Sequence, residues 1–262
     1  MGIEAFDYKG KRTLVVGGSS GMGAATARLL AELGAEVAVA DYAPVPFPVS
    51  QVIKLDLREP ATIDRALAEL KAPIDALFSC AGVAEVPGVM QVNFLGQRHL
   101  IEGMMDRDLL PAGSAIAMIS STAGLGWENE LDMLGGLLDT ASFEEGVAWV
   151  DSHPVRSYYM LSKKAVCAYV ARQGYPLLKR GVRINATQPG PTDTPLARAN
   201  AKLWLGAGRE YREAAGIDLS RPEEQAYVLA FLCSSAASYV TAISIVTDGG
   251  RTSARRMHGF PI

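Results

Sequence analysis

The stretch SYYMLSKKA, residues 157–165, places two tyrosines side by side and two lysines shortly after them. On a helix, residues four apart lie one turn above each other on the same face. Tyr159 and Lys163 have that spacing, whereas Tyr158 and Lys163 are five apart, which turns the lysine off the face. A cation beside a phenol favours the phenolate and lowers a pKa that is ordinarily near ~10. The spacing selects Tyr159 and Lys163 as a candidate acid/base pair, although such a pair also arises by chance on many helices.

A glycine-rich turn, GGSSGMG at 17–23, joins an apolar run to a helical pattern. Glycines here let the backbone bend tightly and approach a pyrophosphate, whose charge lies at the helix N-terminus. The spacing differs from G-x-G-x-x-G, but its place between strand and helix in the first βαβ unit is the required context. The residues predicted to contact a dinucleotide here are Gly17, Ser19, Ser20, Gly21, Met22 and Gly23.

An acid, Asp41, ends the second apolar run. A carboxylate at this place can accept both hydroxyls of an adenosine ribose and would repel a 2′-phosphate. Tyr42 follows it, and no Arg or Lys lies beside it or in the glycine turn. The sequence therefore predicts NAD rather than NADP. Asp56 and Leu57 close the third apolar run and are expected near the adenine.

Apolar runs alternate with amphipathic helical patterns along the whole chain. The expected strands are 13–18, 36–41, 52–57, 74–82, 114–121, 182–190 and 243–250, and the expected helices are 21–35, 62–71, 90–106, 156–179 and 222–235. Continuous apolar strands between helices are typical of a parallel sheet covered on both faces. This predicts an α/β fold, one doubly wound Rossmann-type domain over 1–262 with a mostly parallel sheet of about seven strands.

Two long segments interrupt this alternation. Residues 124–156 stand where a short loop would suffice, and residues 192–218 follow a strand end. Long insertions in compact domains are usually functional or disordered. Both segments contain enough Leu and Trp to pack, so short helices are expected in each, with 192–218 as a lid over the substrate.

The bulk composition excludes several classes of function. The chain has 262 residues, 49% hydrophobic and 20% charged, with a net charge of −3. Neither disorder nor nucleic-acid binding is indicated, and no apolar run reaches the length of a membrane span. The N-terminal sequence lacks the order of a signal peptide, so the cytoplasm is the expected location. Three unpaired cysteines and three scattered histidines do not indicate a disulfide framework or a metal site.

The chain resembles the short-chain dehydrogenase/reductase family along nearly its whole length, because its motifs follow the family's order. They are Gly17-x3-Gly21-x-Gly23, Ser79-Cys80-Ala81-Gly82, Asn93 in VNFLG, Ser121 in ISSTAG, Tyr159-x-x-Ser162-Lys163, Asn185 in VRINA, Pro189-Gly190 with Thr192 and Thr194, and Asp248-Gly249-Gly250. Each motif is modest alone, but eight in order make chance very improbable.

The chain departs from the family pattern at a few positions. Val16 stands where threonine is usual, and Ser79-Cys80 where the family has two asparagines. The connection before Asn93 is short and the gap from Ser121 to Tyr159 is long. This combination resembles the bacterial 3α-hydroxysteroid dehydrogenase/carbonyl reductase branch.

The resemblance implies a role for four residues. Tyr159 would be the general acid/base, and Lys163 the cation that also bonds the nicotinamide ribose. Ser121 would hold the substrate oxygen near the phenol, and Asn93 would help to relay protons through a water to the lysine. Together they imply a dehydrogenase that exchanges a hydride with NAD, the chemistry being the cofactor's own.

The resemblance also distinguishes neighbouring serines and extends the cofactor site. The active serine stands three residues before the glycine of S-x-x-G, here Gly124, which selects Ser121 over Ser120. The further cofactor contacts that it implies are Cys80, Ala81, Gly82, Pro189, Gly190, Thr192 and Thr194.

The substrate pocket is expected to be apolar. Its expected lining is Ala123, Leu125, Trp127, Pro191, Leu196 and Trp204. Such a pocket suits a bulky alicyclic secondary alcohol or ketone, a hydroxysteroid or a terpenoid. No arginine cluster indicates an anionic substrate, although Arg156 and Arg198 leave that open. The basic stretch RTSARRM, 251–257, is interpreted as a solvated tail or a subunit contact.

Most members of the family pair subunits, so a homodimer or homotetramer is expected. The 124–156 insertion would lie beside the usual contact face, which leaves the geometry open. Two alternatives remain. One is a dehydrogenase of a polar sugar or cyclitol, with Glu128, Glu130 and Asp132 exposed to the pocket; the other is a non-enzymatic NAD-binding protein, which has no need of all four catalytic residues.

Overall fold

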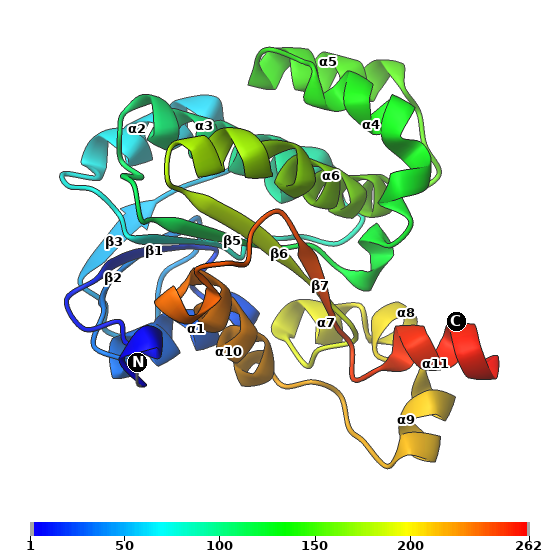
Figure 1. Ribbon diagram of the computed structural model, residues 1–262. Helices are drawn as coiled ribbons and strands as arrows, with labels where there is room; N and C mark the ends of the chain where they lie inside the picture. Colours follow the sequence, from blue (N-terminus) through cyan, green and yellow to red (C-terminus); the bar gives the residue numbers. More distant parts are fainter. Residues whose placement is uncertain (1–2, 261–262) are drawn as a thin grey trace.

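The computed structural model describes residues 3–260, so the domain bounds expected from the sequence exceed it by two residues at each end. Its centre is one parallel sheet of seven strands in the order β3-β2-β1-β4-β5-β6-β7 (Figure 1). The strands are β1 Arg12–Val16, β2 Glu36–Asp41, β3 Gln51–Lys54, β4 Ala76–Ser79, β5 Ala115–Ile119, β6 Arg183–Pro189 and β7 Ser244–Thr247. The predicted doubly wound Rossmann-type fold is confirmed, and the chain reverses direction across the sheet between β1 and β4, where such folds bind ligands.

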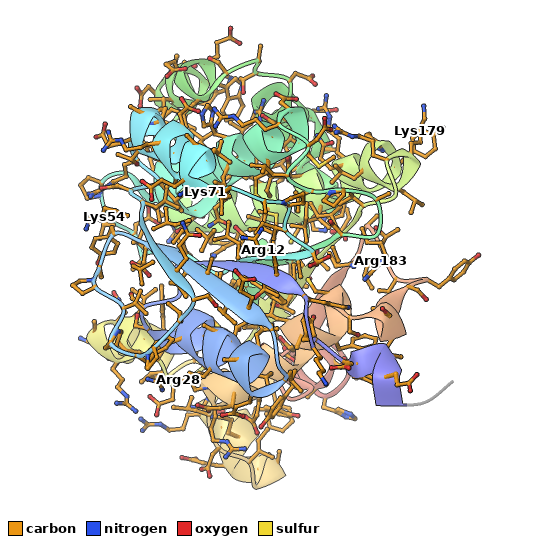
Figure 2. The ribbon with its side chains drawn as sticks, turned by 90° about the vertical axis from the view of Figure 1, so that its left-hand side faces the viewer. Arg12, Arg28, Lys54, Lys71, Lys179 and Arg183 are labelled. Atoms are coloured by element: carbon orange, nitrogen blue, oxygen red, sulfur yellow. The ribbon has the colours of Figure 1, made fainter. Side chains whose placement is uncertain are left out.

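Helices cover both faces of the sheet (Figures 1 and 2). On one face lie α2 Pro60–Glu69, α3 Gly96–Asp106 and α6 Tyr158–Lys179, and on the other α1 Gly21–Glu32 and α10 Pro222–Cys233. Each layer buries its own apolar core against the sheet, and Phe94 and Phe78 are among the fully buried side chains of the two cores. Burial on both faces explains why the strands are continuous apolar runs.

The register of the sheet aligns the strand ends that carry the predicted site. Val16 at the end of β1 is paired with Ala40 of β2 and with Ser79 of β4. The residues that follow these three therefore emerge at one edge. They are Gly17, Asp41 and Cys80.

The insertion forms short helices, as expected. After two short 3₁₀ turns, α4 Leu131–Leu138 and α5 Phe143–Ser152 form a layer beyond α6 (Figure 1). Leu134 and Leu137 are fully buried, and the guanidinium of Arg98 in α3 donates to the Thr140 hydroxyl. Helices α4 and α5 are therefore packed on the α3–α6 face, away from the strand ends.

The segment after β6 also forms short helices, α7 Pro195–Ala199, α8 Ala201–Trp204 and α9 Arg209–Ala215. The last helix, α11 Arg251–His258, lies beside α9 in Figure 1. The Tyr211 hydroxyl donates to the Gly249 carbonyl at 2.6 Å, and its ring lies 5.3 Å from that of Phe260, centroid to centroid. These contacts join α9 to the last helix.

Figure 2 shows the sheet between its two helical layers, with Lys179 extending outward and Arg183 beside the sheet. Arg183 is buried and donates to the carbonyls of Leu232 and Ser234, so it fastens β6 to the end of α10.

Within residues 3–260, every helix is too short or too polar to cross a bilayer. The same residues contain no group of His, Cys, Asp and Glu side chains suited to a metal ion.

Candidate active site

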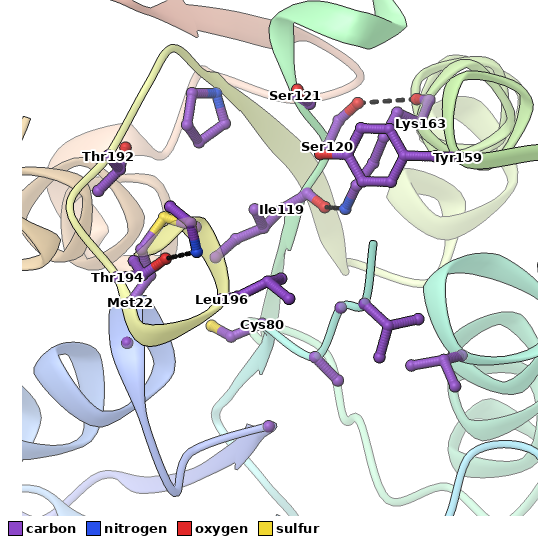
Figure 3. A pocket seen from close by; sticks show the side chains of 18 of the residues that line it. Met22, Cys80, Ile119, Ser120, Ser121, Tyr159, Lys163, Thr192, Thr194 and Leu196 are labelled. Carbon is purple, nitrogen blue, oxygen red and sulfur yellow. Dashed lines mark hydrogen bonds between the residues drawn. The ribbon is translucent and has the colours of Figure 1, made fainter. Parts of the chain in front are cut away.

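A cavity of about 1400 Å³ opens at the carboxyl ends of the strands. Every residue predicted to contact the cofactor lines it, from the glycine turn through the ends of β2 and β4 to the segment after β6. Figure 3 shows part of this lining, with Met22, Cys80 and Thr194 on one side and Tyr159 and Lys163 on the other. The structure thus brings the expected cofactor residues and the Tyr–Lys pair into one cavity.

The glycines of the turn are required by space as much as by conformation. A Cβ on Gly17 would lie 2.4 Å from the Ala81 Cα, and one on Gly23 would lie 2.1 Å from the Gly17 carbonyl oxygen. Gly21 has a φ of +55°, in the left-handed region that favours glycine. The turn therefore keeps its backbone bare where α1 begins, which fits a pyrophosphate bound by backbone N–H groups at a helix N-terminus.

Asp41 is held rigidly at the end of β2. It is 7% exposed, and its two carboxylate oxygens accept hydrogen bonds from the Ser19 and Ala43 N–H groups, each at 2.9 Å. Carboxylate oxygens have further lone pairs, so the group can still accept from ribose hydroxyls.

A basic residue that the sequence reasoning missed, Arg58, also lines the adenosine end of the cavity. It makes a two-pronged ion pair with Asp56, at 2.9 and 2.6 Å, and lowers the pKa of that carboxyl below its usual value. Arg58 lies 17 positions from Asp41 in the sequence, and no local pattern shows that the loop after β3 brings it to the cavity.

Tyr159 and Lys163 lie on one face of α6, as the spacing predicts. The Lys163 Nζ is 5.8 Å from the centre of the Tyr159 ring and donates to the Ile119 carbonyl at 3.0 Å (Figure 3). Tyr158, by contrast, packs against the apolar core and does not line the cavity.

The electrostatics of the pair differ from the expectation. Burial raises the pKa of the Tyr159 phenol, and a hydrogen bond with Ser121 offsets only part of that rise. Burial also lowers the pKa of the Lys163 ammonium, to about 8. The protein groups alone thus favour the protonated phenol, because desolvation outweighs the hydrogen bond with Ser121.

The two neighbouring serines have different partners. The Ser120 hydroxyl donates to the Lys163 carbonyl at 2.7 Å and is buried (Figure 3). Ser121 caps the 3₁₀ turn that follows and reaches the Tyr159 phenol. Gly124 is needed because a Cβ there would lie 2.8 Å from the same Lys163 carbonyl. This geometry favours Ser121 as the residue that faces a reacting oxygen.

Asn93 does not line the cavity. It is fully buried in a π-helical turn, Gln91–Leu95, and its amide bonds the Val83 backbone at 2.8 and 3.0 Å and the Ser162 hydroxyl at 3.2 Å. Its Oδ1 and the Lys163 Nζ would both lie 3.6 Å from a Cβ on Gly82. Its side chain therefore ties the loop after β4 to α6 behind the lysine, and its amide hydrogens are used in doing so.

Glu85, which the sequence analysis did not single out, caps the start of α6. Its carboxylate accepts from the Ser157 hydroxyl at 2.7 Å and from the N–H groups of Tyr158 and Tyr159 at 3.0 Å. An anion at a helix N-terminus satisfies free N–H groups and favours the helix dipole. Glu85 lies 72 residues before Ser157, so no local signal points to it.

Most of the residues predicted for the substrate wall lie at the cavity. Ala123, Leu125, Pro191, Leu196 and Trp204 line the cavity. The Trp204 ring lies over Tyr159, with 5.1 Å between centroids. Trp127, however, packs against the core under the insertion and does not line the cavity, because the backbone turns at Gly126 through a φ of +78°.

The charged residues near the pocket also differ from the expectation. Glu128, Glu130 and Asp132 do not line the cavity, and Glu130 pairs with Lys164 instead. The basic stretch expected to be a solvated tail or a subunit contact forms α11, whose arginines 251, 255 and 256 line the cavity. The sequence could have indicated this place, because the stretch directly follows Asp248-Gly249-Gly250 at the end of β7, and the strand ends carry the site.

The comparisons with known proteins agree with this site. Residues 16–252 match a family described as Enoyl-(Acyl carrier protein) reductase. The chain is 32% identical to a coniferyl-alcohol dehydrogenase of Pseudomonas sp. (strain HR199 / DSM 7063), covering 93% of this chain and 97% of that protein. The chain belongs to the short-chain dehydrogenase/reductase family. It is thus an oxidoreductase of the family that acts on alcohols.

Two further relatives of this short-chain dehydrogenase/reductase extend the comparison. A cis-4-hydroxycyclohexanecarboxylate dehydrogenase of Sinomonas cyclohexanicum is 32% identical over 91% of this chain and 95% of its own. The crystal structure of the 3-alpha-hydroxysteroid dehydrogenase from Pseudomonas sp. B-0831 complexed with NADH has a TM-score of 0.75 at 25% identity, over 96% of this chain and 100% of its own. The family and the fold imply a nicotinamide dinucleotide as cofactor.

Proposed function

We propose that this protein is an NAD-dependent dehydrogenase that interconverts a secondary alcohol on an alicyclic skeleton and the corresponding ketone. The observation that carries the proposal is the placement of Ser121, Tyr159 and Lys163 together in the cavity that contains the glycine turn. Relatives that act on hydroxycyclohexanecarboxylate and on hydroxysteroids by name support a cyclic alcohol.

The preference for NAD rests on Asp41. Its carboxylate is fixed at the end of β2, where it would accept the ribose hydroxyls and repel a 2′-phosphate. Arg58 is the nearby cation that could bind such a phosphate, but Asp56 already pairs with it. The structural neighbour solved with NADH supports the same choice.

The bare glycine turn fits the pyrophosphate, and the Pro189–Thr194 segment fits the nicotinamide end of the dinucleotide. The bound nicotinamide supplies the hydride acceptor. Ser121 orients the substrate hydroxyl, and Tyr159 takes its proton. Lys163 stabilises the resulting phenolate, and the Trp204 ring lies against the Tyr159 ring beside the pair.

The experiment is a panel assay of the purified protein. Reduced-cofactor formation is followed with NAD or NADP and hydroxycyclohexanes, hydroxysteroids, terpenoid alcohols, sugars and coniferyl alcohol. We expect NAD-dependent turnover of the cyclic secondary alcohols. Turnover of sugars alone, or of coniferyl alcohol alone, would contradict the alicyclic substrate.

The cofactor preference is tested with Asp41→Asn in the same assay. We expect the preference for NAD over NADP to fall in this variant, because the repulsion of the 2′-phosphate is weakened. An unchanged preference would show that Asp41 does not select the cofactor.

We also propose that the chain assembles as a homodimer or homotetramer. Because α4 and α5 already cover part of the α3–α6 face, the contact must use other surface or the insertion itself. Sedimentation of the purified protein, with and without residues 127–152, tests this assembly.

A further inference from the structure

The last helix presents an unusual group of cations to the cavity. Arg251, Arg255 and Arg256 of α11 line it, and Arg209 and Arg212 of α9 lie beside them. Burial lowers the pKa of Arg212, and repulsion from Arg251 and Arg209 lowers it further. Like charges are thus held close together, which costs free energy unless an anion joins them.

Arg251, Arg255 and Arg256 have no acidic partner in the part of the chain that the structure describes. The ion pairs there join other arginines to acids, such as Arg58 to Asp56 and Arg198 to Asp193, and none includes Arg251, Arg255 or Arg256. The nearest acid in sequence, Asp248, is already used by the N–H groups of Gly250 and Thr252 and by the Thr252 hydroxyl.

Among these arginines, Arg251 gives the strongest indication of a bound anion. Its Nε is buried and has no hydrogen-bond partner among the described residues. A buried donor without a partner costs about 1–3 kcal/mol, and a bound anion would remove that cost. Its side chain lies against Gly208, where a Cβ would come within 2.3 Å of the same Nε, so the bare backbone of the lid makes room for it.

The lid segment, residues 192–218, connects Arg251 with Tyr159. Trp204 lies over the Tyr159 ring, and Gly208, four residues later, touches Arg251. Arg251 and Tyr159 also line the same cavity, so an anion bound by Arg251 and an alcohol at Tyr159 can belong to one molecule.

We propose that Arg251, assisted by Arg255, binds the carboxylate of an alicyclic hydroxy acid whose alcohol is oxidised at Tyr159. This deepens the function proposed above and rests on it. A planar guanidinium matches a carboxylate with two parallel hydrogen bonds. The phosphates of the dinucleotide offer a similar oxyanion, but the glycine turn and the start of α1 already provide for them.

The first test compares 4-hydroxycyclohexanecarboxylate with its methyl ester as substrates, with NAD. The wild-type protein should prefer the acid by about 10–100-fold in kcat/KM, the range that hydrogen bonds to a charged group supply. Arg251→Met and, more weakly, Arg255→Met should remove that preference and leave the ester almost unchanged. Arg65→Met, an exposed arginine of α2 outside the cavity, loses the same charge and should change neither substrate.

The second test needs no turnover. Cyclohexanecarboxylate, which has no alcohol to oxidise, is titrated by calorimetry into the protein saturated with NADH. Binding should weaken at least about tenfold in Arg251→Met, while NADH binding measured by its fluorescence stays constant. Arg255 is exposed, so its variant keeps the test valid if Arg251→Met does not fold.

The outcomes separate the two proposals. Equal use of acid and ester, or a loss of NADH affinity in place of carboxylate affinity in Arg251→Met, would overturn the anion site. Arg251-dependent binding of cyclohexanecarboxylate without oxidation of any alcohol in the panel would uphold the anion site and refute the proposed dehydrogenase.

Discussion

The two sides of the cavity are built in opposite ways. On the side of β4, β5 and α6, almost every polar side chain has its partner, and Asn93 and Ser120 use theirs to fix backbone groups around Lys163. On the side of α8, α9 and α11, cations face one another, and a buried Arg251 Nε has no partner. On the first side, called the completed side below, the protein already satisfies its polar groups, and only substrate and cofactor are to be added. The second side lacks an anion to balance its cations. Chemistry and specificity thus lie on different structural supports.

The largest expected effect tests the completed side. Tyr159→Phe should lower kcat by about 10²–10⁴-fold, the usual contribution of a general acid/base, with NADH affinity unchanged. Tyr158→Phe is the matched control, because it removes the same atom from a side chain that packs on the core. Steady-state kinetics of both variants decide the assignment, and equal losses would show that neither hydroxyl acts on the substrate.

Lys163 makes the same side sensitive to pH. Its pKa is about 8 in the folded protein and near 10.5 unfolded, so between these values the unfolded chain binds more protons and stability rises with pH. Tyr159, whose pKa is raised, has the opposite effect only above about pH 10. Relative to Lys163→Met, the wild type should gain up to about 3 kcal/mol between pH 8 and 10 in urea unfolding without cofactor. Parallel pH profiles of stability in the wild type and Lys163→Met would contradict a lowered pKa of Lys163.

The glycine turn should tolerate no side chain. Gly23→Ala places a Cβ 2.1 Å from the Gly17 carbonyl oxygen and should cost about 1–3 kcal/mol together with most of the cofactor affinity. Gly135→Ala, inside α4 with nothing near its Cβ, should instead stabilise the protein by about 0.5–1 kcal/mol. Chemical unfolding measures the stability of both variants, and NADH titration measures their cofactor affinity. Equal values for the two variants would mean that the backbone shifts at little cost to relieve the contact at Gly23.

The smallest expected effect concerns the cap of α6. Glu85→Gln keeps an acceptor but removes the charge, and should cost about 1 kcal/mol of stability. Because the cap bonds the Tyr159 N–H, kcat should fall while NADH affinity holds. Glu144→Gln, in the first turn of α5 and far from the cavity, is the control. A loss of stability with unchanged kcat would limit Glu85 to a structural role.

Much of the completed side was predictable, because its signals are local. Four-residue spacing places Tyr159 above Lys163 on any helix, and parallel strands bring Gly17, Asp41 and Cys80 to one edge whatever the loops do. The choice of Ser121 over Ser120 came instead from the resemblance, whose S-x-x-G pattern ends at Gly124.

The rest depends on where distant segments cross. Glu85 caps a helix 72 residues away, and Trp127 is turned into the core by the left-handed backbone of Gly126. The arginines of α11 were interpreted as a solvated tail or a subunit contact, because nothing in their own pattern shows that α9 and the lid lie against them. Such contacts follow from tertiary packing, which periodicity does not encode.

The loop after β4 has one more consequence, for the order of events in a turnover. Its first residues, Cys80, Ala81 and Gly82, line the cavity, and a few positions later Glu85 holds the start of the helix that carries the phenol. A dinucleotide that pins the beginning of this loop also steadies its end. We therefore expect the cofactor to bind first and to leave last, so that the alcohol meets a phenol already in place.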